Sequence, residues 1–277
     1  MKIQKNYFVN GAQMLRGAFF TLIMMALTVQ SSASPTTITT TSGYSATYDD
    51  SVNGFTSWAY GGINQLSLQT LYYSLISGGP LTQLTGGSVV TSSFGSTKYL
   101  TVTYTIAGIG TVADKLSLNG ASLGEQIVFN NTSGENQNMS LYQYSNFVLG
   151  GSSGAGNQYL SISPWSASQA YAVVNQSQIG GAWPLSWKGF ATGYSTLVQA
   201  DSSGAPFGAF IGSGDLDNTT LTASGNAVFG YEFSGPVAAG NNMTVSITSS
   251  FPVPEPSSAA LISTGMLALV WLHRRRS

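Results

Sequence analysis

Tyr99-Leu-Thr-Val-Thr-Tyr-Thr-Ile-Ala107 is a stretch of the 277-residue chain in which apolar and hydroxyl-bearing residues alternate strictly. Leu100, Val102, Tyr104 and Ile106 fall on one face, and the threonines between them fall on the other. A period of two is the pattern of an antiparallel strand that buries one face and exposes the other. The sequence therefore predicts a half-buried strand whose outer face carries hydroxyl groups.

The next residues predict a hairpin. Asp114–Leu118 and Ala121–Phe129 flank Asn119-Gly120, a dipeptide whose residues accept the positive φ that tight hairpin turns require. Asn53-Gly54 is a second turn signal of the same kind. Similar short segments recur at intervals of roughly 10 to 15 residues, a spacing typical of sandwiches and barrels. The sequence predicts an all-β, antiparallel, jelly-roll-like sandwich, with further strands within 34–42, 88–94, 139–149, 158–162, 169–174, 227–233 and 243–251.

Two segments are harder to assign. In 63–77, Leu68, Leu71, Tyr72 and Leu75 fit a helical stripe, whereas Leu66 and Leu68 alternate as in a strand. We predict a strand, because Tyr and Thr favour strands and neither end carries a good helix cap. Residues 179–220 mix Gly, Pro and aromatic residues without a period, so we expect loops there around one strand near 195–199.

The N-terminus has the features of a secretory signal peptide. Lys2, Lys5 and Arg16 precede an apolar segment that begins at Gly17 and ends at Val29. Small residues then lead to Ala33, after which cleavage is expected. The apolar segment is too short to favour a membrane-spanning helix. We predict a signal peptide over 1–33, helical in its apolar part, which signal peptidase removes.

The C-terminus combines three zones in a fixed order. Pro254-Glu255-Pro256 stays extended, because each proline fixes φ and lacks a backbone donor. Residues 257–272 follow without a charged side chain, and then come Arg274, Arg275 and Arg276. A cluster of arginines tends to remain on the cytoplasmic side of a membrane. The sequence predicts an apolar helix that contacts a membrane transiently, with the basic end cytoplasmic.

This arrangement resembles the PEP-CTERM sorting signal of Gram-negative envelope proteins. The resemblance covers about the last tenth of the chain, and the alternative is an ordinary tail anchor. It implies that an exosortase recognises the tail, and that the protein moves from an inner membrane-tethered intermediate to the cell surface or matrix. It also implies association with exopolysaccharide or biofilm. The resulting domains are 1–33 signal peptide, 34–250 β-sandwich and 251–277 sorting signal.

The basic residues of the chain are concentrated at its ends. Between residues 34 and 253 only three lysines remain against nine carboxylates, which gives a net charge of −6. A basic stripe for phosphates is therefore absent, and binding of nucleic acid is not expected. The chain has no cysteine, so that neither a disulfide nor a thiolate metal site contributes.

The residues offer little catalytic chemistry. The single histidine is His273, so no serine–histidine pair and no histidine-ligated zinc site is expected in the sandwich. Two carboxylates held about 5–10 Å apart would suffice for glycoside hydrolysis. The sequence favours a protein without catalysis and without a cofactor. The acids that could pair in a glycan-active enzyme are Asp49 with Asp50, Asp201 with Asp215 and Asp217, and Glu125 with Glu232.

Two weaker site hypotheses concern residues 165–218. Asp215, Asp217 and Asn218 place oxygen ligands as in part of a calcium loop, although a solvated turn explains them better. Trp183 and Trp187 flank Pro184, and loop-borne rings there could stack on sugars. The alternative is that they fill the core. The sequence thus predicts an exported, exosortase-processed matrix protein, with a carbohydrate-binding or glycan-active module as the alternative.

Overall fold

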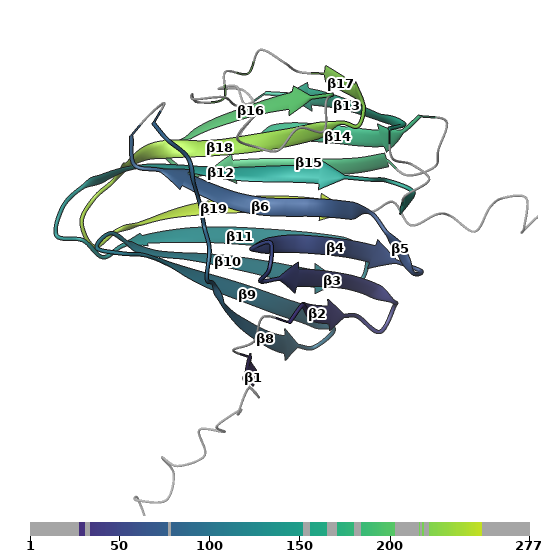
Figure 1. The fold of residues 1–277 in the computed structure, drawn as a ribbon, viewed down its shortest axis with the longest axis horizontal. Helices are drawn as coiled ribbons and strands as arrows, with labels where there is room; N and C mark the ends of the chain where they lie inside the picture. Colours follow the sequence, from purple (N-terminus) through teal and green to yellow (C-terminus); the bar gives the residue numbers. More distant parts are fainter. Residues whose placement is uncertain are drawn as a thin grey trace, which may run out of the picture.

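The computed structural model describes residues 28–30, 34–76, 79–151, 156–164, 171–179, 184–202, 216, 218 and 222–250. These residues form two antiparallel sheets that lie one over the other (Figure 1). Within the described residues there is no helix, so none is long and apolar enough to cross a membrane. Apart from residues 28–30, which form a strand, the predicted signal peptide lies outside the described ranges, and so does the C-terminal apolar segment.

Sheet A has ten strands. Its central part is a meander in which β9, β10 and β11 follow one another, and the last strand, β19, then pairs with β11. Across the sheet the strands are β1 (Thr28–Gln30), β8 (Ser88–Phe94), β9 (Thr97–Ile106), β10 (Gly110–Asn119), β11 (Ser122–Asn131), β19 (Asn242–Ser250), β15 (Pro184–Ala191), β14 (Ala172–Gln178), β13 (Gln158–Ser163) and β17 (Thr222–Gly225).

Sheet B has nine strands. Its central strand β12 pairs with β18 on one side and β6 on the other, and two short strands lie off the main path. The strands are β16 (Ser195–Asp201), β18 (Val228–Val237), β12 (Gln137–Phe147), β6 (Leu66–Ser74), β4 (Gly54–Tyr60), β3 (Tyr44–Asp49) and β2 (Thr36–Thr39), with β5 (Ile63–Asn64) on β4 and β7 (Thr82–Gln83) on β6.

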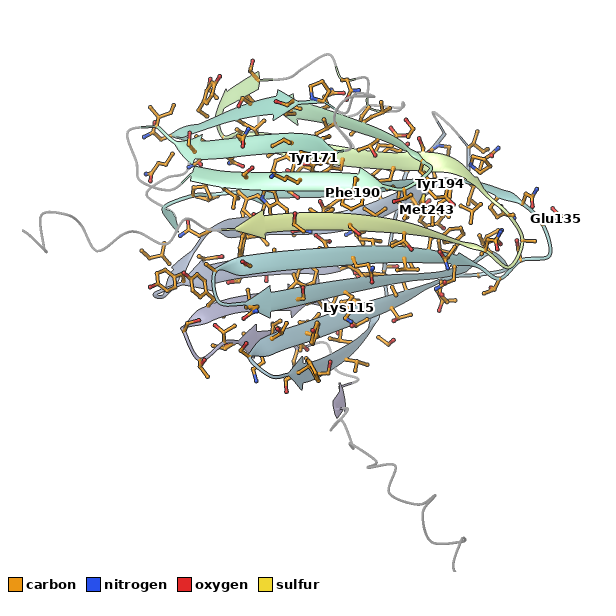
Figure 2. All side chains as sticks on the ribbon, turned by 180° about the vertical axis from the view of Figure 1, so that it is seen from behind. Lys115, Glu135, Tyr171, Phe190, Tyr194 and Met243 are labelled. Atoms are coloured by element: carbon orange, nitrogen blue, oxygen red, sulfur yellow. The ribbon has the colours of Figure 1, made fainter. Side chains whose placement is uncertain are left out.

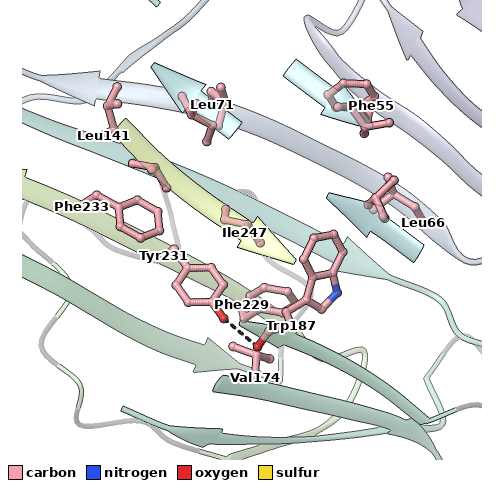
Figure 3. Packing of buried hydrophobic residues seen from close by; sticks show 14 of the residues in the cluster. Phe55, Leu66, Leu71, Leu141, Val174, Trp187, Phe229, Tyr231, Phe233 and Ile247 are labelled. Carbon is pink, nitrogen blue, oxygen red and sulfur yellow. Dashed lines mark hydrogen bonds between the residues drawn. The ribbon is translucent and has the colours of Figure 1, made fainter. Parts of the chain in front are cut away.

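The space between the sheets holds an aromatic cluster. The indoles of Trp58 and Trp187 meet edge to face with their centroids 5.7 Å apart, and Phe147 lies 5.1 Å from Trp187. Tyr231 packs beside them, and its hydroxyl donates to the carbonyl oxygens of Trp187 at 3.2 Å and Ala172 at 3.3 Å (Figure 3). All five of these residues are buried, so this cluster joins sheet B to sheet A through apolar contact.

Strand β6 is covered on both faces, which explains its ambiguous sequence. Leu71 belongs to the core between the sheets, whereas Leu68 and Tyr72 pack into a second cluster with Tyr142 on the outer face of sheet B. Apolar residues on both faces remove the alternation that marks a half-buried strand. The prediction of a strand over this segment is confirmed.

The all-β, antiparallel sandwich is confirmed, and several details differ. Jelly rolls have eight strands, so this larger pair of sheets, with its meander, fits the jelly-roll description poorly. Strand β15 was missed in a segment expected to form loops. Residues 28–30 pair with β8 as strand β1, although they fall in the predicted signal peptide. Removal of the signal peptide stays a prediction.

Candidate ligand-binding groove

Sheet A carries its two carboxylic acids and two of its three lysines on opposite faces. In the strands of this sheet the carboxylic acids are Asp114 and Glu125, and both point into the interior with exposures of 1% and 3%. Lys115 and Lys188 are exposed on the outer face. The described outer face therefore carries cationic and neutral polar groups without an exposed carboxylate.

A row of residues in register crosses this outer face. Tyr99, Ser117, Gly124, Thr248 and Lys188 are successive partners on β9, β10, β11, β19 and β15. With strands about 4.8 Å apart, the row is about 19 Å long. Gly124 is its centre, and a Cβ there would lie 2.7 Å from the hydroxyl oxygen of Ser117. The missing side chain leaves a depression in the middle of the row.

Two adjoining hollows meet at this depression. They have volumes of about 530 Å³ and about 240 Å³, and both are lined by Ser117, Gly124 and Thr248. We call them together the sheet A groove. Its other lining residues are Asn119, Ser122, Leu123, Ser186, Lys188 and Ser249 in the larger part, and Tyr99, Lys115, Glu125, Gln126, Ser246 and Ile247 in the smaller.

Aromatic rings hold both lysines of the groove. The Lys115 ammonium lies 4.6 Å from the centroid of the Tyr99 ring, and that of Lys188 lies 5.2 Å from the Tyr171 ring. Figure 2 shows this side of the molecule, with Lys115, Tyr171 and Phe190 on it. Phe190 is 37% exposed. A cation–π contact positions an ammonium without neutralising it, so both charges remain available to an anion.

The interior side of the same strands carries a buried polar cluster. Glu125 accepts hydrogen bonds from the side-chain amides of Gln69 at 2.7 Å and Gln143 at 2.5 Å, both donors coming from sheet B. Asp114 donates a further hydrogen bond to Glu125. Next to them the Tyr104 hydroxyl donates to that of Tyr48 at 3.2 Å. The cluster links the two sheets by hydrogen bonds instead of apolar contact.

Burial governs the ionisation of this cluster. It raises the pKa of Glu125 to about 7, although hydrogen bonds from Gln69 and Gln143 work in the opposite direction. Burial and then the neighbouring Glu125 raise the pKa of Asp114 well above its usual range. Burial also raises the pKa of Tyr48 to about 12. Asp114 therefore holds its proton more tightly than an exposed carboxyl does, and it shares that proton with Glu125.

Of the acid pairs expected from the sequence, Asp49 and Asp50 remain neighbours, Glu125 and Glu232 are not brought together, and Asp215 and Asp217 lie outside the described residues. Glu125 lies between the sheets, whereas Glu232 alternates with the core residues Tyr231 and Phe233 and so points to the other side of sheet B. The Glu232 carboxylate accepts a hydrogen bond from the Leu216 amide at 2.9 Å. Asp49 accepts two hydrogen bonds from Ser51 and closes a local turn.

The calcium hypothesis can be followed only at Asn218, because Asp215 and Asp217 lie outside the described residues. The Asn218 side-chain oxygen accepts a hydrogen bond from the Val198 amide at 2.7 Å, and its φ is 58°. This is a turn residue in the left-handed region. In the described part of the chain no three His, Asp or Glu side chains group closely enough to hold a metal ion.

The two tryptophans proposed for sugar stacking are Trp183 and Trp187. Trp183 lies outside the described residues. Trp187 is 1% exposed and belongs to the aromatic cluster of the core. Its stacking role is wrong for this structure, because strand β15 turns alternate residues inward and places Lys188 and Phe190, rather than Trp187, on the surface.

The chain leaves the sandwich at the end of β19, beside the groove residues Asn119 and Ser122. Residues 252–276 follow directly and match the family model of the PEP-CTERM protein-sorting motif. The chain carries a PEP-CTERM sorting motif. Pro254, Glu255, Pro256 and the three arginines Arg274, Arg275 and Arg276 lie within this match and outside the described residues. The PEP-CTERM motif implies processing by an exosortase, with export and sorting to the surface or exterior.

Solved structures resemble the fold at low sequence identity. A bacterial glucoamylase complexed with acarbose has a TM-score of 0.55 at 11% identity, covering 87% of this chain and 36% of its own length. This chain thus spans about a third of that protein. A galactose mutarotase-like protein from Clostridium acetobutylicum has a TM-score of 0.53 at 8% identity, with coverages of 82% and 98%. No protein of curated function matches the chain by sequence. These likenesses show the fold alone.

Sequence reasoning missed the groove, although part of its signal was present. The alternation in 99–107 predicted a hydroxyl-bearing outer face, and Tyr99 and Thr101 do alternate with buried Leu100. What the sequence could not supply was the order of strands. The final strand β19 lies between β11 and β15, which brings Thr248 beside Gly124 from 124 residues away along the chain.

Proposed function

We propose that this protein is exported, processed by signal peptidase and an exosortase, and works without catalysis in the envelope or extracellular matrix of a Gram-negative bacterium, associated with exopolysaccharide. The observation that carries the proposal is the PEP-CTERM motif at 252–276, placed directly after the last strand. In this proposal residues 257–272 tether an intermediate to the inner membrane. The signal peptide over 1–33 starts export, and cleavage follows Ala33.

The position of the motif supports a sorting role separate from the folded domain. Strand β19 is hydrogen-bonded on both sides, to β11 and β15, so the domain can hold its last strand while the tail is recognised. Pro254 follows Ser250 by four residues, which reach at most about 14 Å. The processing enzyme therefore works close to the end of sheet A that carries Asn119 and Ser122.

Cell fractionation of a motif variant tests the proposal. Glu255→Ala should leave the protein in the membrane fraction, whereas the wild type should reach the surface or medium. Glu135→Ala is the matched control, because Glu135 is an exposed acid at the far end of the sandwich (Figure 2). If Glu255→Ala is released as efficiently as the control, the exosortase proposal fails.

A second candidate function is a carbohydrate-binding or glycan-active module, and the sheet A groove favours its binding form. The groove combines hydroxyls, amides and aromatic rings, the groups that orient and stack sugars. The structural neighbours named above as a glucoamylase and a galactose mutarotase-like protein fit this candidate distantly. Its hydrolytic form needs two carboxylates that a glycan can reach. Burial of Asp114 and Glu125 between the sheets favours the form without hydrolysis.

A further inference from the structure

The outer face of sheet A is charged differently from the rest of the exported domain. The region between residues 34 and 253 has three lysines, and two of them, Lys115 and Lys188, line the sheet A groove. The described carboxylates of this sheet face inward, and the exposed or half-exposed acids Asp49, Asp201 and Glu135 belong to sheet B or to loops. A negatively charged ligand would be repelled elsewhere and attracted here.

The ammonium groups of the two lysines are held at fixed positions on this face. Each ammonium lies over a tyrosine ring, and neither has a carboxylate partner in the described part of the chain. Three strand spacings and two residues along the strand separate their backbones, which corresponds to about 16 Å. Two fixed charges at that spacing fit a polymer with separated charges. A nucleic acid, with a charge per about 1.7 Å of duplex, would need many more cations.

The surface between the lysines suits sugars. Ser117, Ser186, Ser246 and Thr248 present hydroxyls, and Gly124 keeps the floor of the groove open. Phe190, in the row next to Lys188, offers an exposed ring. Hydroxyl and aromatic groups bind sugar rings, and the lysines select for negative charge among them.

We propose that the sheet A groove binds an anionic polysaccharide, a polymer whose sugars carry carboxylates. The inference rests on the proposed function, because it names the kind of exopolysaccharide with which the exported protein associates. The sugar carboxylates pair with Lys115 and Lys188, and the chain of sugars crosses the strands over Gly124.

The test measures binding of the full chain, purified in detergent micelles, to a polyuronate such as alginate and to neutral dextran by titration calorimetry. The wild type should bind the polyuronate, and binding should weaken when salt rises from about 50 mM to about 500 mM. Lys115→Gln and Lys188→Gln should each weaken binding about threefold, and together about tenfold. Lys98→Gln is the matched control, because it changes the net charge equally and Lys98 does not line the groove.

A second variant tests the groove independently of charge. Gly124→Val places methyl groups on the groove floor, where the nearest atom is the rotatable Ser117 hydroxyl, and should weaken binding at least about tenfold. Thr105→Val, at an exposed outward position of β9 outside the groove, should leave binding unchanged. Equal binding of dextran, comparable binding of double-stranded DNA, or equal losses in Lys98→Gln and the groove variants would overturn the inference. Because the chain is purified before processing, these outcomes are independent of the fractionation test of exosortase sorting.

Discussion

The same two strands, β10 and β11, carry the buried polar cluster on one face and the sheet A groove on the other. Asp114 and Lys115 are neighbours in sequence, as are Gly124 and Glu125, and alternation sends them to opposite sides of sheet A. Inside, the Glu125 carboxyl group accepts hydrogen bonds from glutamine amides of sheet B. Outside, the ammonium groups rest on aromatic rings without a carboxylate in the described part of the chain.

This difference shows two uses of charged residues in a chain that has few of them: buried carboxyl groups hold the structure, and exposed lysines stay available to a ligand. The inner carboxyl groups lower their cost of burial by keeping protons and accepting hydrogen bonds, which makes them part of the structure. The outer lysines remain charged and solvated, so their substitution should change binding more than folding. Substitutions in the buried cluster should therefore change the free energy of unfolding, whereas substitutions of the outer lysines should change ligand affinity.

The two adjacent residues of β15, Trp187 and Lys188, should differ most in what their substitution costs in stability. Trp187→Ala removes a buried indole from between the sheets and should lower the free energy of unfolding by about 3–5 kcal/mol. Lys188→Ala, one residue further on the outer face, should lower it by at most about 1 kcal/mol. Urea unfolding followed by circular dichroism measures both. Similar losses for the two variants would contradict the assignment of inner and outer faces.

The pH dependence of stability should come from the buried cluster. Because the pKa of Glu125 is higher in the folded than in the unfolded chain, the folded state binds its proton more tightly. The stabilisation that this proton gives to the folded state is complete below the pKa of Glu125 in the unfolded chain, about 4.5. It is lost as the pH rises through the pKa in the folded chain, about 7. Burial raises the pKa of Asp114 as well, so this group adds a change of the same sign. The free energy of unfolding should therefore fall by roughly 3 kcal/mol or more between about pH 5 and about pH 8. Stability that rises over this range would contradict the buried pair.

Removing the Glu125 carboxyl should weaken that dependence, while Asp114 still contributes a fall of stability with rising pH. Glu125→Gln keeps an acceptor for Gln69 and Gln143 and offers an amide to Asp114, so the hydrogen-bonded shape can remain. At about pH 8 the variant should be more stable than the wild type by about 2 kcal/mol. Glu135→Gln, at an exposed site, should leave the pH profile unchanged. Unfolding midpoints measured from pH 5 to pH 8 distinguish the two variants.

The smallest expected effect compares two tyrosine hydroxyl groups. Tyr231→Phe removes a buried donor to the Trp187 and Ala172 carbonyl oxygens and should cost about 1 kcal/mol of stability. Tyr194→Phe removes an exposed hydrogen bond of 3.2 Å to the Asn242 carbonyl oxygen and should cost less than about 0.5 kcal/mol. Thermal unfolding of both variants under one buffer condition provides the comparison. A larger loss of stability in Tyr194→Phe than in Tyr231→Phe would contradict the assignment of the Tyr231 hydrogen bonds to the interior and of the Tyr194 hydrogen bond to the surface.

The sequence predicted the strands where one face is buried and the other wet. Strands β9 to β11 fit that description, and Gly120 takes a φ of 55° in the expected hairpin turn. The strand predicted within the Thr-rich 34–42 segment is also confirmed, by β2 at an edge of sheet B. The prediction failed at β15, because Pro184, Gly189 and the aromatic residues around them resemble a loop in composition. Gly189 is small because the Tyr231 ring packs against it, a contact that arises only once the sheets are stacked.

The candidate sites show the same limit. The sorting motif could be predicted because its recognition depends on a contiguous stretch, and residues 252–276 match it. The groove depends on Gly124, Thr248 and Lys188, which meet only through the pairing of β11, β19 and β15. The buried cluster likewise joins Gln69 and Gln143 to Glu125 across the sandwich. Strand order and sheet stacking, which local patterns do not encode, decide both.

The intact mass of the protein recovered from outside the cells shows whether both ends of the chain have been processed. Processing at both ends predicts a product that begins after Ala33 and lacks residues 257–277, while the sandwich over 34–250 is complete. A product that still carries residues 257–277 would contradict exosortase processing.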